Sequence, residues 1–394
     1  MPMAGTKRRV NILQVSYTYA HFVETGGPAV KVQAIAEGLA KRGHAVGVLT
    51  VSYGRRELEQ KAMGGVEIEY LRPWFRYRTF TIAPSVVPFC VRRLRGFDVV
   101  HVYGLYEMLG PIVGFFCRRR DIPYVLEPIG MGRASGRSLG KKRMYNALFG
   151  RGLVGNAALI IATSEREQEE LLEDGVPKDR LILRRNGVDV SQFNPPPPQG
   201  RFRARAGIGQ NEKVVIFLGR MAPIKNLDML IEAFASFTNN DERLVLVGPD
   251  EGDGYVDRLK SLAARLGLDG RVHFAGPLYG QEKIEALADA DTLVLPSRSE
   301  SFGMAALEAM ACGKPVVVTE ECGIAPYVKG RAGLVVRRET AAIAEGIRTV
   351  LEHPELASRF GKEGKTIAAQ LSWDEPVSQM ERLYGQLTER HRAA

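Results

Sequence analysis

The sequence contains little that would mark a secreted, zinc-binding or membrane-spanning protein. It has four cysteines in 394 residues, and none of Cys90, Cys117, Cys312 and Cys322 has the CxxC spacing of zinc sites or redox motifs. We therefore expect small buried thiols in a reducing compartment, with no disulfides or zinc ligands. The sequence also lacks an apolar run of about 18 residues, which a membrane-spanning helix needs, and the apolar core of a signal peptide. These absences predict a cytoplasmic protein.

Negative charge is outnumbered in the first half of the chain only. Residues 1–194 carry 29 Lys and Arg against 18 Asp and Glu, a net +11, and residues 195–394 carry 25 against 27, a net −2. This asymmetry predicts an anionic partner for the first half, such as a membrane surface or an anionic lipid-linked acceptor. Any single basic cluster could also be an ordinary solvated surface. A nucleic-acid partner is not expected, because no RRM, KH or zinc-finger signature occurs. The basic stretches are 72–80, 92–96, 117–121 and 132–146.

Short runs rich in Val, Ile and Leu alternate with longer amphipathic stretches along the whole chain. An example of the latter is the one-faced helix predicted over 29–43, which ends at a glycine. This alternation predicts an α/β protein with doubly wound parallel sheets. The predicted strands are 10–16, 45–51, 66–71, 98–104, 123–128, 157–164 and 181–187 in the first half, and 214–220, 243–249, 272–278, 291–297, 314–320 and 333–338 in the second.

The chain is long enough for two domains, and a run of four prolines at 195–198 cannot continue a helix or a central strand. We therefore place the first domain at 1–194, a linker at 195–200 and the second domain at 201–372. Ligands of doubly wound sheets bind beyond the carboxyl ends of the strands. We expect a binding site in a central cleft between the two domains.

Two loops after predicted strands carry groups suited to phosphate. TGGPAVKVQ (25–33) follows the first strand, and Gly26 and Gly27 there allow close approach of a ligand to a helix start. LGRMAPIKN (218–226) presents Arg220 and Lys225, two cations that suit a diphosphate. The alternatives are a plain flexible turn for the first loop and solvated surface charges for the second.

The stretch PSRSESFGMAALEAM (296–310) places one carboxylate on a turn and another on the following helix. Backbone N–H groups of Phe302, Gly303 and Met304 are expected at the helix start, where they can donate to an anionic or hydroxyl-bearing ligand. Glu300 can accept from sugar hydroxyls and Glu308 from a ribose. The alternative is an acidic first turn plus a surface glutamate, although a lone carboxylate in the small-residue helix around Glu308 needs partners.

Together with TGGPAV and RRNGVD (184–189), the segments GRMAPIKN and ESFGMAALE resemble the large family of retaining glycosyltransferases typed GT4, which have the GT-B fold. The resemblance covers essentially the whole chain. It implies two Rossmann-like domains facing a central cleft. The closing segment LSWDEPVSQMERLYGQL is similar to the family's last helix, which crosses back to the first domain; we place that helix at about 373–394.

The resemblance assigns roles to individual positions. It implies that Arg220 and Lys225 hold the diphosphate of the donor, that Glu300 lies near the donor sugar, and that Glu308 bonds the ribose; Arg220, Lys225 and Glu300 are the candidate catalytic residues. The other donor-side positions that it implies are Gly26, Gly27, Asn186, Leu278, Phe302, Gly303 and Met304.

One segment departs from the family pattern. Many relatives have a histidine after the strand that here reads YVLEPIGMG, where this chain has Glu127, Pro128 and Ile129. The Pro–x–Gly form of this segment is similar to that of polysaccharide-assembly members. Glu127 and His101 are the two acceptor-side candidates, and His101 could equally be an ordinary strand-end histidine.

The predicted function is transfer of a hexose, with retention, from a UDP- or GDP-sugar to a hydroxyl of a lipid-linked or growing surface polysaccharide. A soluble small-molecule acceptor and a non-catalytic scaffold that binds sugar nucleotides are the alternatives. No metal and no cofactor besides the donor are expected: the only Asp-x-Asp pair, Asp289 and Asp291, lies where a helix enters a strand and is expected to cap that junction. We expect a cytoplasmic protein, peripheral on the inner face of the membrane.

Overall fold

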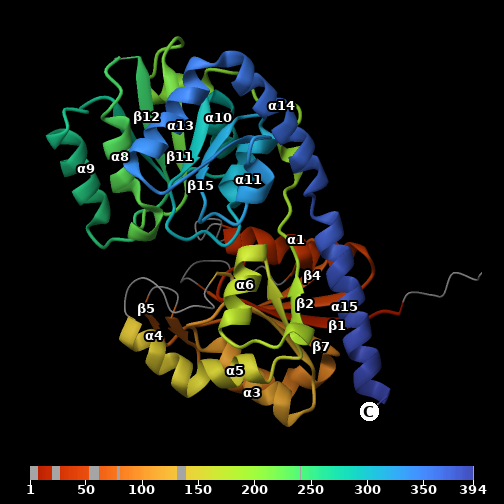
Figure 1. The fold of residues 1–394 in the computed structure, drawn as a ribbon. Helices are drawn as coiled ribbons and strands as arrows, with labels where there is room; N and C mark the ends of the chain where they lie inside the picture. Colours follow the sequence, from red (N-terminus) through yellow and green to blue (C-terminus); the bar gives the residue numbers. More distant parts are fainter. Residues whose placement is uncertain are drawn as a thin grey trace, which may run out of the picture. The chain divides into compact units, whose positions relative to one another are not determined.

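A computed structural model of the protein describes residues 8–19, 27–52, 62–77, 80–130, 139–239 and 241–393. The chain divides into two compact units (Figure 1). Unit 1 comprises Met1–Arg185 and Trp373–Ala394, and unit 2 comprises Asn186–Ser372. The Pro-rich segment 195–200 falls within unit 2.

Unit 1 is built on an eight-stranded sheet in the order β10-β9-β8-β7-β1-β2-β4-β3, in which only β3 is antiparallel to its neighbour. Central strands such as β7 are buried along their whole length, as expected for a sheet covered on both faces. The strands are β1 (Asn11–Val15), β2 (Ala45–Val51), β3 (Ala62–Met63), β4 (Val66–Leu71), β7 (Val99–Tyr103), β8 (Tyr124–Glu127), β9 (Leu159–Ala162) and β10 (Leu181–Leu183), with a separate hairpin of β5 (Phe75–Tyr77) and β6 (Phe80–Ile82).

Two apolar cores lie against this sheet. One contains side chains of α2, α3, α5 and α6, and the other contains side chains of α1 and α15. The helices of unit 1 are α1 (Gly27–Lys41), α2 (Val86–Arg93), α3 (Leu109–Arg119), α4 (Leu139–Tyr145), α5 (Arg151–Gly155), α6 (Glu165–Glu173) and α15 (Asp374–Ala393), with a π-helical turn η4 (Asn146–Gly150) and 3₁₀ turns η3 (Leu94–Gly96) and η5 (Lys178–Arg180).

The C-terminal helix α15 belongs to unit 1, although the chain before it belongs to unit 2. Val377, Met380 and Tyr384 of α15 are buried in the core that it shares with α1. On the same side Arg42 Nη1 pairs with Glu381 Oε2 at 2.9 Å. These contacts confirm the expected return of the last helix to the first domain.

Unit 2 is built on a six-stranded, fully parallel sheet in the order β13-β12-β11-β14-β15-β16. Its strands are β11 (Lys213–Leu218), β12 (Glu242–Val247), β13 (Val272–Gly276), β14 (Thr292–Leu295), β15 (Val316–Thr319) and β16 (Gly333–Val336). Its helices are α7 (Arg201–Ala206), α8 (Leu227–Phe234), α9 (Tyr255–Arg265), α10 (Gly280–Asp289), α11 (Met304–Ala311), α12 (Ala325–Val328), α13 (Thr340–Glu352) and α14 (Pro354–Gln370), with 3₁₀ turns η6 (Val190–Phe193) and η7 (Pro223–Lys225). The two parallel α/β units confirm the predicted fold class.

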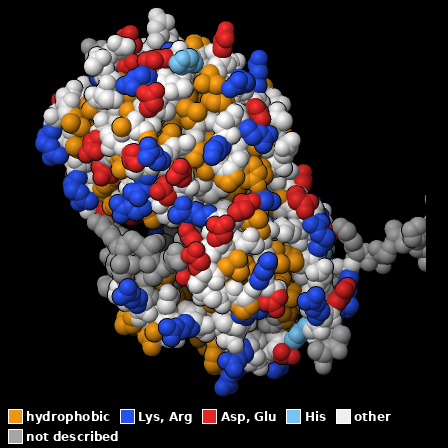
Figure 2. Space-filling view, viewed as in Figure 1, with side chains coloured by type: hydrophobic (Ala, Val, Ile, Leu, Met, Phe, Trp, Pro, Cys, Tyr) orange, Lys and Arg blue, Asp and Glu red, His pale blue; other side chains and the backbone are white. Residues whose placement is uncertain are grey.

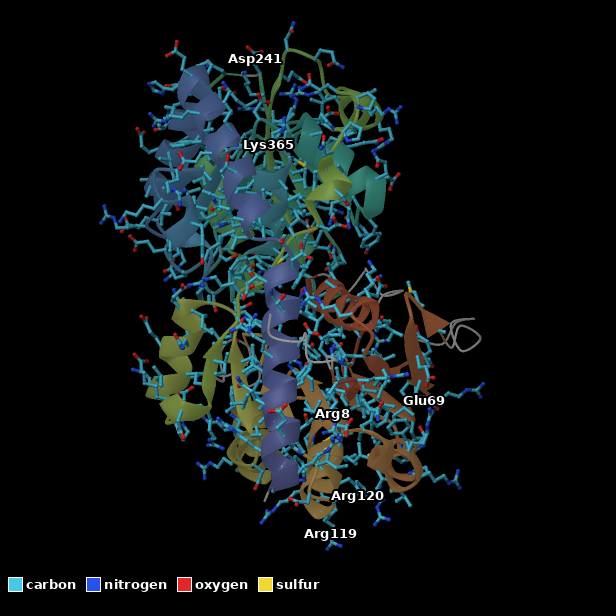
Figure 3. The ribbon with its side chains drawn as sticks, turned by 90° about the vertical axis from the view of Figure 1, so that its right-hand side faces the viewer. Arg8, Glu69, Arg119, Arg120, Asp241 and Lys365 are labelled. Carbon is cyan, nitrogen blue, oxygen red and sulfur yellow. The ribbon has the colours of Figure 1, made fainter. Side chains whose placement is uncertain are left out.

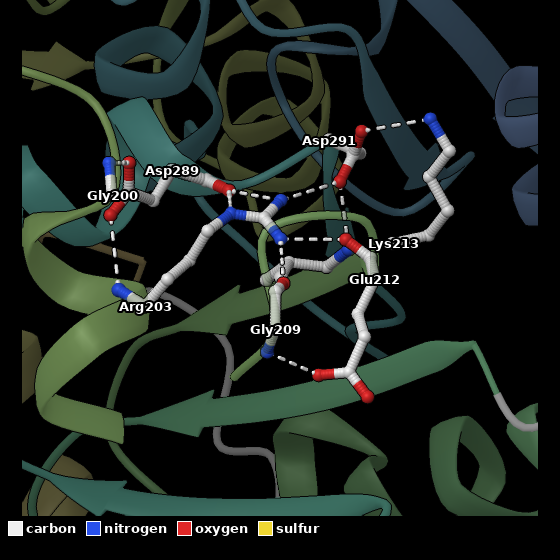
Figure 4. Close-up of polar contacts among 8 residues, drawn as sticks. Gly200, Arg203, Gly209, Glu212, Lys213, Asp289 and Asp291 are labelled. Carbon is white, nitrogen blue, oxygen red and sulfur yellow. Dashed lines mark hydrogen bonds and ion pairs between the residues drawn. The ribbon is translucent and has the colours of Figure 1, made fainter. Parts of the chain in front are cut away.

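The Asp-x-Asp pair holds the first helix of unit 2 in place (Figure 4). Asp289 Oδ1 accepts from the Gly200 N–H at 2.6 Å, and its Oδ2 accepts from the N–H groups of Phe202 and Arg203 at 2.8 and 3.1 Å, which caps α7. Asp291 pairs with the Arg203 guanidinium at 3.1 Å. The two carboxylates satisfy backbone donors and a buried arginine, as expected for a capped junction.

The cysteines are unpaired: Cys90, Cys117 and Cys322 are buried and Cys312 is half-buried, as predicted. Among the described residues, no helix is both long and apolar enough to cross a membrane. In that same part of the chain, no group of three or more His, Cys, Asp or Glu is arranged to hold a metal ion.

Glu107 provides a pH-dependent contribution to the stability of unit 1. It is buried before α3, accepts from the N–H groups of Leu109 and Gly110 at 2.6 Å each, and burial raises its pKa to about 7. A pKa raised above the unfolded value contributes stability that is complete below the unfolded pKa and is lost as pH rises through the folded pKa. We therefore expect the free energy of unfolding of the wild type, relative to Glu107→Gln, to fall by about 2 kcal/mol between about pH 5 and 7. Urea unfolding at these pH values measures it, and parallel pH profiles would contradict it.

Candidate active site

Three neighbouring strands of unit 2 end in glycine. Gly219 and Gly248 directly follow β11 and β12, and Gly276 is the last residue of β13; all three have positive φ. Their backbones are bonded in series: the Gly219 N–H donates to Val247 O and the Gly248 N–H donates to Gly276 O, each at 2.9 Å. These strand ends therefore form a side-chain-free edge, which a ligand can approach closely.

Gly248 is the most constrained of these glycines. A Cβ atom at this position would lie 1.8 Å from the carbonyl oxygen of Gly219, whereas a Cβ at Gly252, also with positive φ, would meet no atom within 4 Å. We expect Gly248→Ala to destabilise unit 2 by at least about 2 kcal/mol, because the two strand ends must separate. Gly252→Ala is the control for the effect of φ alone, about 1 kcal/mol. Equal melting temperatures of the two variants would contradict the steric argument.

The loops after β11 and β14 are joined to each other. These strands pair in parallel, so their carboxyl ends lie side by side. The Arg298 N–H donates to Ile224 O at 2.9 Å, and Asn226 Nδ2 donates to Pro296 O at 3.2 Å. At this junction Lys225 Nζ forms an ion pair with Glu300 Oε2, with both side chains mostly buried. Two of the predicted catalytic residues are thus in direct contact.

Arg220, the third predicted catalytic residue, lies one position beyond Gly219 and is half exposed. Its guanidinium forms an ion pair with Glu251, in the loop after β12. The backbone there is held by a bridge between Met221 and Asp250. Arg220 is therefore accessible to solvent but already has one carboxylate partner.

The helix α11 begins at the predicted ligand-binding turn. Gly303 is its N-cap, with φ of 109°, and a Cβ there would lie 2.9 Å from Ile324 Cγ2. Phe302 is buried in the core of unit 2, so only its backbone is available to a ligand. Met304 is the first residue of the helix. The first N–H groups of a helix lack intrahelical acceptors and carry a positive partial charge, which suits an anion.

Glu308, on α11, has the partner that its surroundings required. Its Oε1 accepts from Lys283 Nζ of α10 at 2.8 Å, and both side chains are largely buried. Each of the two glutamates of the ESFGMAALE segment is therefore paired with a lysine from another element, Glu300 with Lys225 and Glu308 with Lys283.

The other predicted donor-side positions are dispersed. Asn186 is buried at the first position of unit 2, and Leu278 is half-buried between β13 and α10. Gly27 is the first residue of α1 in unit 1, and Gly26 lies outside the described residues.

A fully buried ionic cluster occupies the carboxyl ends of the strands in unit 1. Glu127, the last residue of β8, accepts from Lys31 Nζ of α1 at 2.6 Å and, through both oxygens, from Arg184 Nη2 at 2.9 Å. Burial acts to raise the Glu127 pKa, but the positive charges of Arg184 and Lys31 outweigh it, so the pKa lies below its ordinary value. The Lys31 pKa is lowered by burial, an effect that Glu127 partly offsets.

His101 belongs to the same cluster. Its Nε2 lies 3.6 Å from Glu127 Oε2, its Nδ1 lies 2.6 Å from the Tyr384 hydroxyl, and its ring stacks on Tyr103. Burial lowers the His101 pKa to about 3, so the ring is neutral at physiological pH. These contacts are those of a structural strand-end histidine, the alternative reading of its position.

Two features of these sites were absent from the sequence-based hypothesis. Glu251 and Lys283 pair with predicted donor-site residues, and Lys31 and Arg184 pair with Glu127. The only available signal was a charged residue near a strand or helix end. The unit 2 arrangement offers cations, a helix start and carboxylates at one sheet edge, which are the groups needed to bind a sugar diphosphate.

Two family models match the chain, one in each half. The model described as glycosyl transferases group 1 matches residues 198–367. The model described as glycosyl transferase 4-like domain matches residues 26–187.

Named relatives and solved structures agree with these matches. A D-inositol 3-phosphate glycosyltransferase of Frankia alni is 32% identical over 302 residues, covering 70% of this chain and 71% of the relative. One of the same name from Nocardia farcinica is 29% identical over 375 residues, covering 89% and 82%. The structure of Anabaena HepE with UDP and glucose matches with a TM-score of 0.80 at 22% identity over 96% of this chain and all of the other. Sucrose-phosphate synthase of Thermosynechococcus elongatus matches with a TM-score of 0.79 at 23% identity, covering 97% and 100%.

Proposed function

The chain belongs to the family of group 1 glycosyl transferases, and from this premise we propose that it transfers a hexose from a UDP- or GDP-sugar to a hydroxyl of a lipid-linked or growing surface polysaccharide. It is a retaining glycosyltransferase of the GT4 class with a nucleotide-sugar donor and the GT-B fold. The sugar, the nucleotide and the acceptor are the proposed part.

The observation that carries the donor assignment is the Lys225–Glu300 pair at the joined ends of β11 and β14. We infer that Lys225 and Arg220 bind the diphosphate, together with the N–H groups at the start of α11. Glu300 accepts hydrogen bonds from the sugar, and Glu308 accepts from the ribose. The backbone near Leu278 meets the base, and Asn186 and the Gly26–Gly27 loop complete the donor site.

The reaction breaks the bond between the anomeric carbon and the diphosphate oxygen and forms a bond from the acceptor oxygen to the same face. In a same-face displacement the departing diphosphate oxygen takes the acceptor proton, so no side-chain base is required. The task of the protein is then to stabilise the negative charge that develops on the leaving group. Preorganised cations and helix N–H groups do this in a partly buried site, where charge interactions are stronger than in water.

We propose that these cations act without a metal ion. The support is the chemistry of the one Asp-x-Asp pair, whose carboxylates already cap α7 and neutralise Arg203.

The test is a thermal-shift panel of UDP, GDP, ADP and TDP with their hexose conjugates, each with and without EDTA. A ligand that binds only the folded state at about 100 times its dissociation constant adds about 2.7 kcal/mol of stability. We expect one nucleotide family to raise the melting temperature in EDTA and to lose this effect in Lys225→Ala. Shifts that disappear in EDTA would exclude metal-free binding, and no shift with any nucleotide would exclude the proposed donor site.

A soluble anionic acceptor is the second candidate. The relatives quoted above are named for D-inositol 3-phosphate, and the net charge of +11 in residues 1–194 also suits a small phosphorylated acceptor. Transfer of radiolabelled hexose to inositol phosphate in detergent-free buffer supports this candidate, whereas transfer only to lipid extracts supports the polysaccharide acceptor.

A further inference from the structure

Large apolar side chains are exposed mainly in unit 1. Among the described residues, unit 2 contributes only Leu266, which is 40% exposed, to the set of exposed large hydrophobic residues. The exposed side chains on the helices of unit 1 include Val91 at 53%, Phe115 at 55%, Met144 at 60% and Leu148 at 66%, together with Val87 and Phe149. Trp74, 82% exposed, precedes the β5–β6 hairpin, which leads into α2.

The helices that carry these side chains form one continuous layer. Arg120 Nη2, at the end of α3, donates to the Val91 carbonyl of α2 at 2.9 Å. Gly114 of α3 lies so close to α5 that a Cβ there would be 3.0 Å from Leu153 Cδ1. The π-helical turn η4 joins α4 to α5. The inner sides of α2, α3 and α5 are already buried against the sheet, so these helices are apolar on a second, outward side.

The same layer is strongly basic. The elements α2, η3, α3, α4, η4 and α5 contain no Asp or Glu. Figure 3 shows Arg119 and Arg120 at the end of α3, and the Arg119 guanidinium lies 5.2 Å from the centre of the Phe115 ring. Hydrophobic and basic side chains gather side by side along the lower edge of unit 1 in Figure 2. The exposed arginines of the layer are Arg92, Arg93, Arg95, Arg118, Arg119, Arg143 and Arg151, of which Arg93 pairs with Glu67 and Glu69.

We propose that this apolar–basic face, formed by the outer sides of α2, α3 and the α4–η4 segment, docks on the surface of an anionic lipid bilayer. The apolar side chains enter the boundary between headgroups and acyl chains, and the arginines reach lipid phosphates. An apolar face flanked by basic residues gains both hydrophobic and electrostatic free energy only where the partner combines hydrocarbon with negative charge.

The charge of the face disfavours other partners. A second copy of the chain would place arginines opposite arginines in a two-fold interface, which is repulsive. A nucleic acid would satisfy the arginines but would leave the valine, leucine and methionine side chains without an apolar partner. The docking face adds to the proposed function without resting on it, because lipid binding requires neither donor nor acceptor.

The experiment is sedimentation of the full-length protein with vesicles, without nucleotide. Vesicles of phosphatidylcholine with about one third phosphatidylglycerol are compared with pure phosphatidylcholine, at about 0.1 M and 0.5 M NaCl, because salt screens the electrostatic part. The double variant Phe115→Glu/Leu148→Glu tests the apolar part and Arg118→Glu/Arg119→Glu tests the charge. The matched controls are Leu266→Glu and Arg337→Glu, exposed residues of unit 2.

We expect the wild type and both controls to sediment with the anionic vesicles, and each double variant to bind at least about tenfold more weakly. Wild-type protein that stays in the supernatant, or double variants that bind as the controls do, would overturn the proposal. A dimer in light scattering that both double variants dissociate would instead make the face a contact between copies. Binding of RNA that the Phe115/Leu148 variant retains while vesicle binding is absent would identify a nucleic-acid surface.

The two double variants are independent, since one changes apolar and the other charged side chains. Circular dichroism and the nucleotide-induced thermal shift of unit 2 report whether each is folded. A variant that keeps its nucleotide shift but loses vesicle binding separates membrane docking from donor binding. A folded wild type that binds vesicles but shows no nucleotide shift would contradict the proposed donor site and leave the docking face intact.

Discussion

Replacing Lys225 with alanine is expected to lower kcat/KM for sugar transfer by about 10²- to 10³-fold, with most of the loss in kcat. This is the usual effect of removing one preorganised donor to a developing negative charge. The substitution also leaves the Glu300 carboxylate without its ammonium partner at the place where the donor diphosphate is to bind. An unpaired negative charge there repels the donor, so we also expect a higher KM.

Lys213 provides the matched control. It is the first residue of the same strand β11 and pairs with Asp291 at 3.5 Å in a half-exposed position, away from the glycine edge. Lys213→Ala is expected to leave both kinetic constants within about threefold, because exposed ion pairs contribute about 1 kcal/mol or less. Initial rates over a range of donor concentrations measure both variants. If Lys225→Ala retained wild-type kcat/KM, Lys225 would be a structural partner of Glu300 and not a donor ligand.

Replacing Glu127 with glutamine is expected to lower the free energy of unfolding of unit 1 by about 3–5 kcal/mol. Removing one member of a buried ion pair leaves an uncompensated charge in the interior. Here two cations, Lys31 and Arg184, lose their shared carboxylate, and neither side chain has access to water. The other buried group beside Glu127 is His101, which is neutral and cannot replace the lost negative charge.

The two tryptophans allow this loss to be measured in unit 1 alone. Trp74 and Trp373 are the only tryptophans of the chain, and both belong to unit 1. Urea unfolding followed by tryptophan fluorescence therefore reports on this unit, while the nucleotide-induced thermal shift reports on unit 2. Glu165→Gln, which removes an exposed ion pair with Arg185, is the control and is expected to change stability by less than about 1 kcal/mol. A Glu127→Gln variant as stable as this control would show that the cluster is not held by its charges.

The strands were predictable because they are buried on both faces. Each of the predicted Val-, Ile- and Leu-rich runs contains a strand of the structure, with ends shifted by at most a few residues. The exceptions are β3, β5 and β6, two or three residues each, which are too short for any periodicity. Their pairings are antiparallel and set by local turns, which the search for α/β alternation did not address.

The site was predictable in part, for a related reason. Arg220, Lys225 and Glu300 were found because strand ends and helix starts can be located in a sequence. The pairing of Lys225 with Glu300, 75 positions apart, depends on β14 lying beside β11, and the order of strands in a parallel sheet is not written in any single segment. The cluster around Glu127 is harder still, because it joins β8 to α1, to the end of β10 and, through His101, to α15.

The position of α15 has a consequence for the order in which the protein can fold. Domains generally form as they emerge during synthesis, starting from the N-terminus. The core on the α1 side of unit 1, however, includes Val377, Met380 and Tyr384 of α15. While the ribosome is still making unit 2, one face of the first sheet therefore has α1 but not α15 to cover it. Unit 1 is begun first and completed last, so its apolar surface stays open to chaperones, and to aggregation, for the whole time that unit 2 is being translated.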